Sequence, residues 1–389
     1  MRFPEFSGEW EKCSLGEIGH TSIGLTYSPA DVVKEDGIIV LRSSNIQDGE
    51  IDYKDLVRVN KKIKDSLFTK KDDILICARN GSPRLIGKNA LISDVDAGHS
   101  YGAFMMVYRS EENPFVRQLL CTKRYFAQVG ENLGARINQI TTSDMNSFEF
   151  FFPQSKEERN KIALFLRIID ERISTQKKII EKYESLIRGI VETHYSQCEC
   201  IKQVRISELG EPFTTMNMSK EDLSEEGNEC ILYGELFTTY GCVIKEVKSR
   251  THISTDKATI SRSNDMLFPA STTVDAISLI APSAICKEGV ILGGDLFGIH
   301  VNKDYNNEYL SYLIKYIYKS KLARYAQGST IIHLHYSDIK KATLLLPTIE
   351  EQNYLAYLMR GVEEKVNIEK DMLSQLYRQK AYLLSNLFI

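Results

Sequence analysis

The stretch from residue 156 to 190, KEERNKIALFLRIIDERISTQKKIIEKYESLIRGI, carries the clearest structural signal in the chain. From Ile162 to Ile190 the positions of one apolar stripe recur at alternating spacings of four and three residues. This heptad spacing is typical of the a and d positions of a coiled coil. A helix of about 40 residues is about 60 Å long at 1.5 Å per residue, which is more than one small domain covers. The stripe therefore predicts a partner helix.

The same pattern returns 193 residues later, between Leu355 and Leu383. A polar residue interrupts both patterns at the same heptad position, as Gln176 and as Glu369, and such a residue commonly fixes the register of a coiled coil. Because both copies leave their domains in the same sense, we predict an antiparallel pair with a globular domain at each end. The alternative is that each helix packs only on its own domain. The predicted coiled-coil interface consists of Ile162, Leu166, Ile169, Ile173, Ile180, Tyr183, Ile187, Leu355, Met359, Val362, Val366, Leu373, Leu376 and Leu383.

The rest of the chain is duplicated as well. Residues 15–17, Leu-Gly-Glu, return as residues 209–211, and Pro153 before the first long helix returns as Pro347. All offsets lie between 192 and 194 residues, far longer than the period of a solenoid. The sequence therefore predicts a duplicated domain, that is, one physical task performed at two places.

Each half combines short apolar runs, typical of strands, with one helical segment before the heptads. The predicted strands lie at 38–41, 74–77, 104–107 and 148–151 in the first half, and at 230–233, 266–268, 290–292 and 343–346 in the second. The predicted helical segments are 114–130 and about 308–327, each ended by a glycine. The expected fold class is α+β, with two pseudo-symmetric α/β domains separated by two long antiparallel coiled-coil helices. The expected division is 1–155, 156–197 (central helix), 198–347 and 348–389 (distal helix).

The composition excludes several classes of protein. Hydrophobic residues make up 43% of the 389 residues, which is ordinary for globular domains. No apolar run approaches 18 residues, so we expect no membrane span, and the first residues lack the apolar core of a signal peptide. The eight cysteines form no CxxC pair, which argues against a zinc site and fits a reducing cytoplasm.

Charge is distributed unevenly along the chain. The net charge is −3, which by itself does not favour nucleic-acid binding. Residues 54–88, however, contain ten Lys or Arg and only four Asp, and the equivalent stretch 245–262 is also basic. Two basic stretches at equivalent positions of a duplicate favour a surface that faces phosphate groups.

The chain resembles the specificity subunits of type I restriction–modification enzymes over nearly its whole length. The resemblance is carried by Arg2-Phe3-Pro4-Glu5-Phe6 followed by Trp10, by the helical regions 153–195 and 347–388, and by Ile231-Leu232-Tyr233-Gly234-Glu235-Leu236. It implies that each globular part is a target recognition domain for one half of a split, asymmetric DNA sequence. It also implies that the helices set the spacing and dock two methyltransferase (modification) subunits. The complex then recruits restriction subunits, which act as translocase and nuclease.

The candidate DNA contacts rest on side-chain chemistry. The loop at 78–84 offers arginine for guanine, asparagine for adenine and a glycine for close approach, and the equivalent loop at 270–273 offers hydroxyl groups. Each candidate has a solvated turn as its alternative explanation. The predicted DNA-binding residues are Arg42, Ser44, Asn45, Arg79, Asn80, Ser82, Arg84, Lys88, Arg136, Asn138, Tyr233, Arg250, Ser271, Thr272, Thr273, His333 and His335.

We predict no catalytic, cofactor or metal site. No glycine-rich cofactor loop or nucleotide-binding motif is present. Asn113-Pro114-Phe115 lacks the second proline of an amino-methyltransferase motif, and His333 and His335 have no nearby third ligand. The resemblance implies that the deoxyribonuclease and adenine methyltransferase activities belong to partner subunits. The competing hypotheses are a coiled-coil adaptor that never touches DNA, and an enzyme that acts on DNA alone.

Overall fold

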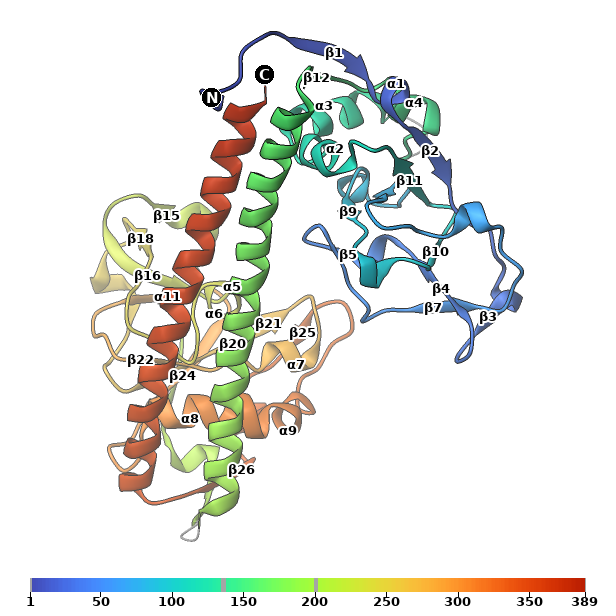
Figure 1. Cartoon of the computed structure of the whole chain (residues 1–389). Helices are drawn as coiled ribbons and strands as arrows, with labels where there is room; N and C mark the ends of the chain where they lie inside the picture. The colour runs from blue at the N-terminus through green and yellow to red at the C-terminus, as the bar shows by residue number, and fades with distance from the viewer. Residues whose placement is uncertain (1, 134–137, 199–201, 389) are drawn as a thin grey trace. The chain divides into compact units, whose positions relative to one another are not determined.

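The computed structural model describes residues 2–133, 138–198 and 202–388, which form two compact units (Figure 1). The first unit consists of Met1–Gln176 with Met372–Ile389, and the second of Lys177–Asp371. Both long helices are therefore shared, because each contributes one part to each unit. The predicted four-part division of the chain stays a prediction.

The first unit is built on two four-stranded sheets and a two-stranded ribbon. One sheet has the order β10 (Ser100–Tyr101), β4 (Ile38–Leu41), β7 (Val57–Val59), β3 (Val32–Val33). The other has the order β2 (His20–Ile23), β11 (Met105–Arg109), β8 (Ile74–Cys77), β9 (Asn89–Leu91), and β1 (Trp10–Ser14) pairs with β12 (Glu149–Pro153) in the ribbon. Among the strand pairs of the first unit that the structure describes, β10–β4 is the parallel one, and Leu25 and Gly102 form an isolated parallel bridge. The buried runs of β8 and β11 form the centre of an apolar core.

The second unit repeats this arrangement with two additional edge strands. Its first sheet has the order β15 (Leu223–Ser224), β18 (Ser249–Thr251), β16 (Asn228–Leu232), β23 (Ile291–Gly293), β19 (Thr259–Ile260). Its second has the order β14 (Gly210–Thr214), β24 (Leu296–Val301), β20 (Asp265–Pro269), β22 (Ser283–Ile285), β17 (Val243–Ile244), and β13 (Lys202–Arg205) pairs with β26 (Thr343–Leu346). The parallel pair β16–β23 matches β4–β10. The two halves therefore share one topology, which confirms the duplicated α/β fold.

The predicted helix 114–130 is wrong as a single element. The structure has α2 (Asn113–Leu119) and α3 (Lys123–Asn132) instead. Thr122 separates them, because its hydroxyl donates to the carbonyl of Leu119 at 2.7 Å and accepts from the amide of Tyr125 at 3.3 Å. A threonine that caps a helix in this way competes with a continuous helix.

The predicted helix 308–327 also differs from the structure. It consists of α8 (Asn307–Leu313), the π-helical segment η9 (Ile314–Tyr318) and α9 (Lys319–Ala323). Gly328 is therefore not the helix stop. Its φ of +117° belongs to the turn that leads into β25 (Ile332–His333), where a Cβ would lie 2.0 Å from the carbonyl oxygen of Ile331.

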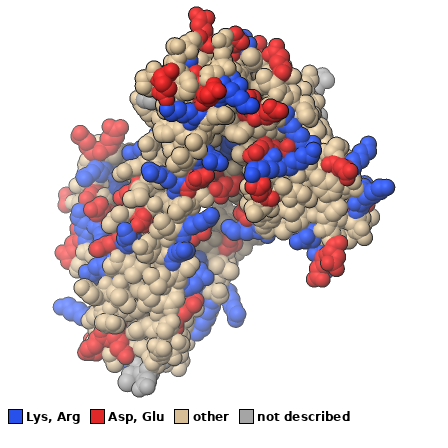
Figure 2. All heavy atoms as spheres, in the orientation of Figure 1, with Lys and Arg blue, Asp and Glu red and all other residues tan. Residues whose placement is uncertain are grey.

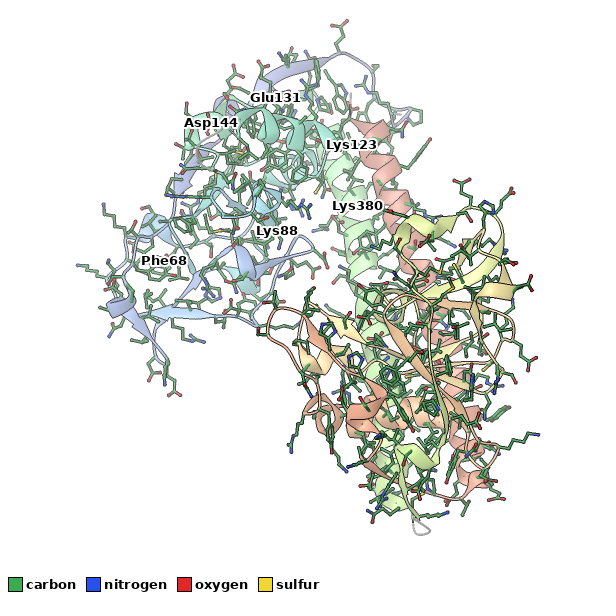
Figure 3. All side chains as sticks on the ribbon, turned by 180° about the vertical axis from the view of Figure 1, so that it is seen from behind. Phe68, Lys88, Lys123, Glu131, Asp144 and Lys380 are labelled. Atoms are coloured by element: carbon green, nitrogen blue, oxygen red, sulfur yellow. The ribbon has the colours of Figure 1, made fainter. Side chains whose placement is uncertain are left out.

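The long helices are α5 (Lys156–Gln197) and α11 (Ile349–Leu387), and they lie side by side within each unit (Figure 1). In the first unit, the seam residues from Ile162 to Ile173 share an apolar core with Leu373, Leu376 and Leu383. Lys380, labelled in Figure 3, forms an ion pair with Asp170 across the two helices.

In the second unit the same two helices continue their pairing. Lys370 Nζ lies 2.9 Å from Glu184 Oε1, and the thiol of Cys198 lies 3.6 Å from Glu351 Oε2. From one contact to the next, the residue numbers rise along α5 while the numbers of their partners fall along α11. The two helices are therefore antiparallel. Ten of the fourteen predicted seam residues are buried, and Tyr183, Val362, Leu373 and Leu376 are half-buried. The polar seam residues Gln176 and Glu369 are buried too.

Candidate nucleic-acid interface

Three polar segments of the first unit, far apart in the sequence, meet at one place. Asn80 Nδ2 donates to Ser43 Oγ at 3.0 Å, which joins the loop after β8 to the turn after β4. Arg79 forms an isolated β-bridge with Gln139, and Asn138 Nδ2 donates to the carbonyl of Gly81 at 3.0 Å. The structure therefore brings together the predicted residues of the 42–45, 79–84 and 138–139 segments. Arg136 lies outside the described residues.

Arg79 and Arg84 are the exposed cations of this cluster. The Arg79 guanidinium lies 5.1 Å from the ring centroid of Phe104, which is itself 57% exposed. Among the described residues, no side chain forms an ion pair with either arginine. Arg84 projects from the short helix η4 (Pro83–Leu85). Both guanidinium groups thus keep their donors available for a ligand.

Other predicted residues of the first unit are partly engaged within the protein. Arg42 Nη2 forms an ion pair with Asp55 Oδ2 at 2.7 Å, and Lys88, labelled in Figure 3, lies 3.4 Å from Gln47 Oε1. Ser44 is exposed, whereas Ser82 is half-buried and its amide donates to Asn80 Oδ1 at 3.0 Å. The contact between Ser82 and Asn80 lies within the loop after β8 and holds its shape.

Asn45 was predicted to contact DNA, but it does not face solvent and is therefore not available to a ligand. Its side chain is fully buried. Its amide nitrogen donates to the carbonyls of Asp52 and Asp55, each at 2.9 Å, and its oxygen accepts from the backbone amide of Arg42 at 2.9 Å. All these partners are local, so Asn45 shapes the turn that presents Arg42 and Ser44.

In the second unit four of the seven predicted residues, Tyr233, Ser271, Thr272 and Thr273, line a hollow of about 1040 Å³. β21 (Ser271–Thr272) pairs with β25, so that Ser271 lies opposite His333. The hollow, here called the second-unit hollow, is lined on one side by Tyr233 after β16 and on another by residues 271–274. The segment after β16 and the loop after β20, both predicted from the sequence, therefore line one concave surface.

The other three predicted residues of the second unit, Arg250, His333 and His335, do not line the hollow. His333 and His335 are exposed and stack with ring centroids 6.1 Å apart. Arg250 lies opposite Glu229 at the beginning of β16, the end remote from Tyr233, and the structure does not bring it to the hollow. Among the described residues, no group of three or more His, Cys, Asp or Glu side chains is arranged to hold a metal ion.

Three lysines of the second-unit hollow were not among the residues predicted from the sequence. Lys220, Lys315 and Lys319 line it, and the last two are half-buried. Burial lowers the pKa of Lys319, and the nearby positive charge of Lys315 lowers it further. The sequence could have indicated that Lys315 and Lys319 lie together, because they are four residues apart in a predicted helical segment. Side chains at i and i+4 of a helix share one face. Over the visible face of the molecule, basic and acidic side chains are interspersed (Figure 2).

Comparison with known proteins identifies the family. The model of the type I restriction modification DNA specificity domain matches residues 7–185 and again 199–378. The chain belongs to this family and carries its domain twice. This result favours DNA recognition over the adaptor hypothesis and over catalysis by the chain alone. Within the described residues, no helix is long and apolar enough to cross a membrane.

Individual relatives agree with this assignment. The type I restriction enzyme EcoKI specificity subunit of Escherichia coli K12 is 27% identical over 180 residues, which is 43% of this chain and 39% of that protein. The StySPI specificity subunit of Salmonella potsdam is 25% identical over 187 residues, covering 46% and 40%. The matched part thus spans about two fifths of each relative. The crystal structure of the type I restriction–modification S subunit from M. genitalium covers 100% of this chain and 99% of its own, with 16% identity and a TM-score of 0.63, and shows the same fold.

Proposed function

We propose that this chain is a non-catalytic specificity subunit that reads a split, asymmetric DNA sequence, one half with each unit. The observation that carries the proposal is a single topology built twice with unlike polar loops. The first unit presents Arg79 and Arg84, whereas the second presents the exposed Thr273 beside Tyr233, with the buried Ser271 and Thr272 also lining the hollow. Equivalent positions with different donors select different bases, because base readout depends on the pattern of donors and acceptors.

The long helices would dock two copies of the same methyltransferase subunit. Leu164 and Phe165 on α5 are exposed in the first unit, and their repeats Tyr357 and Leu358, 193 positions later, are exposed on α11 in the second. Exposed apolar groups at such positions are typical of protein–protein interfaces. Two equivalent surfaces favour two identical partners. In this proposal the adenine methyltransferase and deoxyribonuclease activities reside in the modification and restriction subunits of a cytoplasmic complex.

The test is selection from a library of DNA duplexes by the chain assembled with its modification subunits. We expect two short fixed segments of different sequence with an unread gap of constant length, and methylated adenines within those segments. The mass of the complex should correspond to two modification subunits. The affinity should fall steeply as salt rises, because phosphate contacts release counterions. Retention of DNA that is independent of both sequence and salt would instead support the adaptor hypothesis.

A further inference from the structure

Lys315 and Lys319 place two cations in the second-unit hollow. They are the second residue of η9 and the first of α9, four positions apart, and both line the hollow. Among the described residues, no carboxylate lies within 4 Å of either ammonium. The hollow also contains the hydroxyl-bearing side chains of Ser271 and Thr273. Such a set of donors is suited to an anion with several oxygen atoms.

Glu363 and Glu184 act electrostatically on Lys315, and Asp275 acts on Lys319, but none of these carboxylates forms an ion pair with its lysine. The Glu363 carboxylate is occupied by the hydroxyl of Tyr312 and, at 3.1 Å, by the amide of Cys242, and burial raises its pKa. The thiol of Cys242 beside Lys315 is neutral near pH 7, because burial raises its pKa to about 12. Arg188 of α5 adds a further positive charge near Lys319. Of the charged side chains that line the hollow itself, three are lysines and one is Glu235, so its lining carries a net positive charge.

The mouth of the hollow is apolar. Val274 is 71% exposed and Ile331 is 50% exposed, and both line the same hollow as the lysines. Exposed aliphatic side chains next to half-buried ammonium groups match a ligand that joins an anionic group to an apolar one. A nucleic-acid backbone has this alternation, since each phosphate is followed by a sugar.

We infer that the second-unit hollow binds one phosphodiester of the DNA backbone between Lys315 and Lys319, with Val274 and Ile331 against the neighbouring sugar. The inference rests on the proposed function and adds to it the residues that position the second half of the target. It also explains why the loop after β20 carries hydroxyl groups and no arginine. In the second unit the cations come from the helical segment behind the loop.

The first unit has no counterpart of this pair. Asn113 and Asn307 begin equivalent helices 194 residues apart, and the same offset places Cys121 and Tyr125 where the second unit has Lys315 and Lys319. Tyr125 is fully buried and uncharged. A phosphate contact of this kind therefore belongs to the second half of the target alone.

The inference is tested with Lys319→Gln and with Lys315→Gln plus Lys319→Gln, in the full chain assembled with its modification subunits. The matched control is Lys340→Gln plus Lys341→Gln, which removes two exposed lysines outside the hollow. The slope of log K against log salt should fall by about 1 in the double variant, because one phosphate contact is lost. Phosphate ethylation should cease to interfere at one position of the second half-site. The control should change neither readout, and Lys319→Arg should retain the wild-type slope.

The outcomes separate this inference from the proposed function. If the wild-type complex selects a split sequence but the double variant keeps both slope and ethylation pattern, the hollow is not a backbone site. If the wild type selects no split sequence, the proposed function itself fails. Calorimetry with inorganic phosphate and with a mononucleotide forms the second arm. Tight binding of either, abolished by Lys319→Gln while the DNA slope is unchanged, would assign the hollow to a free phosphorylated ligand and overturn the inference.

Discussion

At the scale of residues, the contribution of a polar side chain depends on what else it touches. Arg79 and Asn45 both follow strands and both belong to residue types that read bases, yet only Arg79 is exposed. The sequence shows that asparagine occupies a turn, but it does not show that three backbone groups surround the amide. Lys315 and Lys319 were missed for the opposite reason. Lysines in a helical segment are ordinary, and only the folded structure shows that these two face a hollow.

Replacement of Arg79 by alanine tests the first unit at this scale. We expect altered base preference in one half-site, with a loss of about 1–3 kcal/mol in discrimination at one position, because a bidentate arginine contributes about that much. Selection from the duplex library measures it. Lys62→Ala, which removes an exposed lysine of the basic stretch 54–88, is the control and should weaken binding without changing the preferred bases. An Arg79→Ala effect spread over both half-sites would contradict the division of labour.

A second residue-scale prediction concerns a buried carboxyl group whose partner differs between the two units. In the first unit Arg109 Nη2 lies 2.9 Å from Asp73 Oδ2, and in the second His300 Nδ1 lies 2.5 Å from Asp265 Oδ1. Burial raises the pKa of Asp265. A raised pKa in the folded state means that the contribution of Asp265 to stability is fully present below the ordinary carboxyl pKa of about 3.9. It is lost as pH rises through the folded-state pKa.

Asp265→Asn removes this titration. The melting temperature of the variant relative to wild type should therefore rise as pH increases from about 4 to 7, with each kcal/mol seen as roughly 2–4 °C. In the matched variant, Asp73→Asn, the permanent cation Arg109 loses its carboxylate, so stability should fall at neutral pH. Thermal unfolding at several pH values measures both. A relative stability of Asp265→Asn that falls as pH rises would show that His300 holds the carboxylate ionised.

At the scale of elements, the heptads were readable from the sequence because one physical requirement repeats along 40 residues. A long apolar stripe must be covered, and the seam positions from Ile162 to Ile173 are buried against α11 in the first unit. The shorter helical segments were less predictable. Their ends depend on single contacts, such as the cap made by Thr122 and the π-helical turn of η9. Hydrophobic periodicity alone carries no information about such contacts.

Ile173→Asp and Ile168→Asp separate the buried seam from the exposed face of the same helix. Ile173 is 6% exposed and Ile168 is 43% exposed. An aspartate at 173 would be buried without a partner, and we expect a loss of roughly 3 kcal/mol or more in unfolding free energy, with loss of assembly with the modification subunits. Ile180→Asp should act in the same way in the second unit. Denaturant unfolding of the chain alone measures the effect, and equal losses for Ile173→Asp and Ile168→Asp would contradict the paired seam.

At the scale of the whole molecule, duplication followed by divergence explains why the two units differ where they do. Their sheets keep one strand order, including the parallel pairs β4–β10 and β16–β23. The loops after equivalent strands have changed, with arginines at 79 and 84 in one unit and hydroxyl groups at 271–273 in the other. Buried strand positions are constrained by packing in both copies, whereas exposed loops are free to follow different targets.

Independent reading by two units makes a quantitative prediction for the combined variant Arg79→Ala with Lys319→Gln. Each substitution lies in its own unit and, in our proposal, contacts its own half of the target, so the two losses in binding free energy should add to within about 0.5 kcal/mol. Binding of the assembled complex to the selected duplex at fixed salt, for wild type, both single variants and the double variant, gives the four values required. The pair Arg79→Ala with Arg84→Ala is the positive control for coupling, because both residues belong to one loop. A coupling above about 1 kcal/mol between Arg79 and Lys319 would mean that recognition of one half-site alters the other, and that the two units do not read DNA separately.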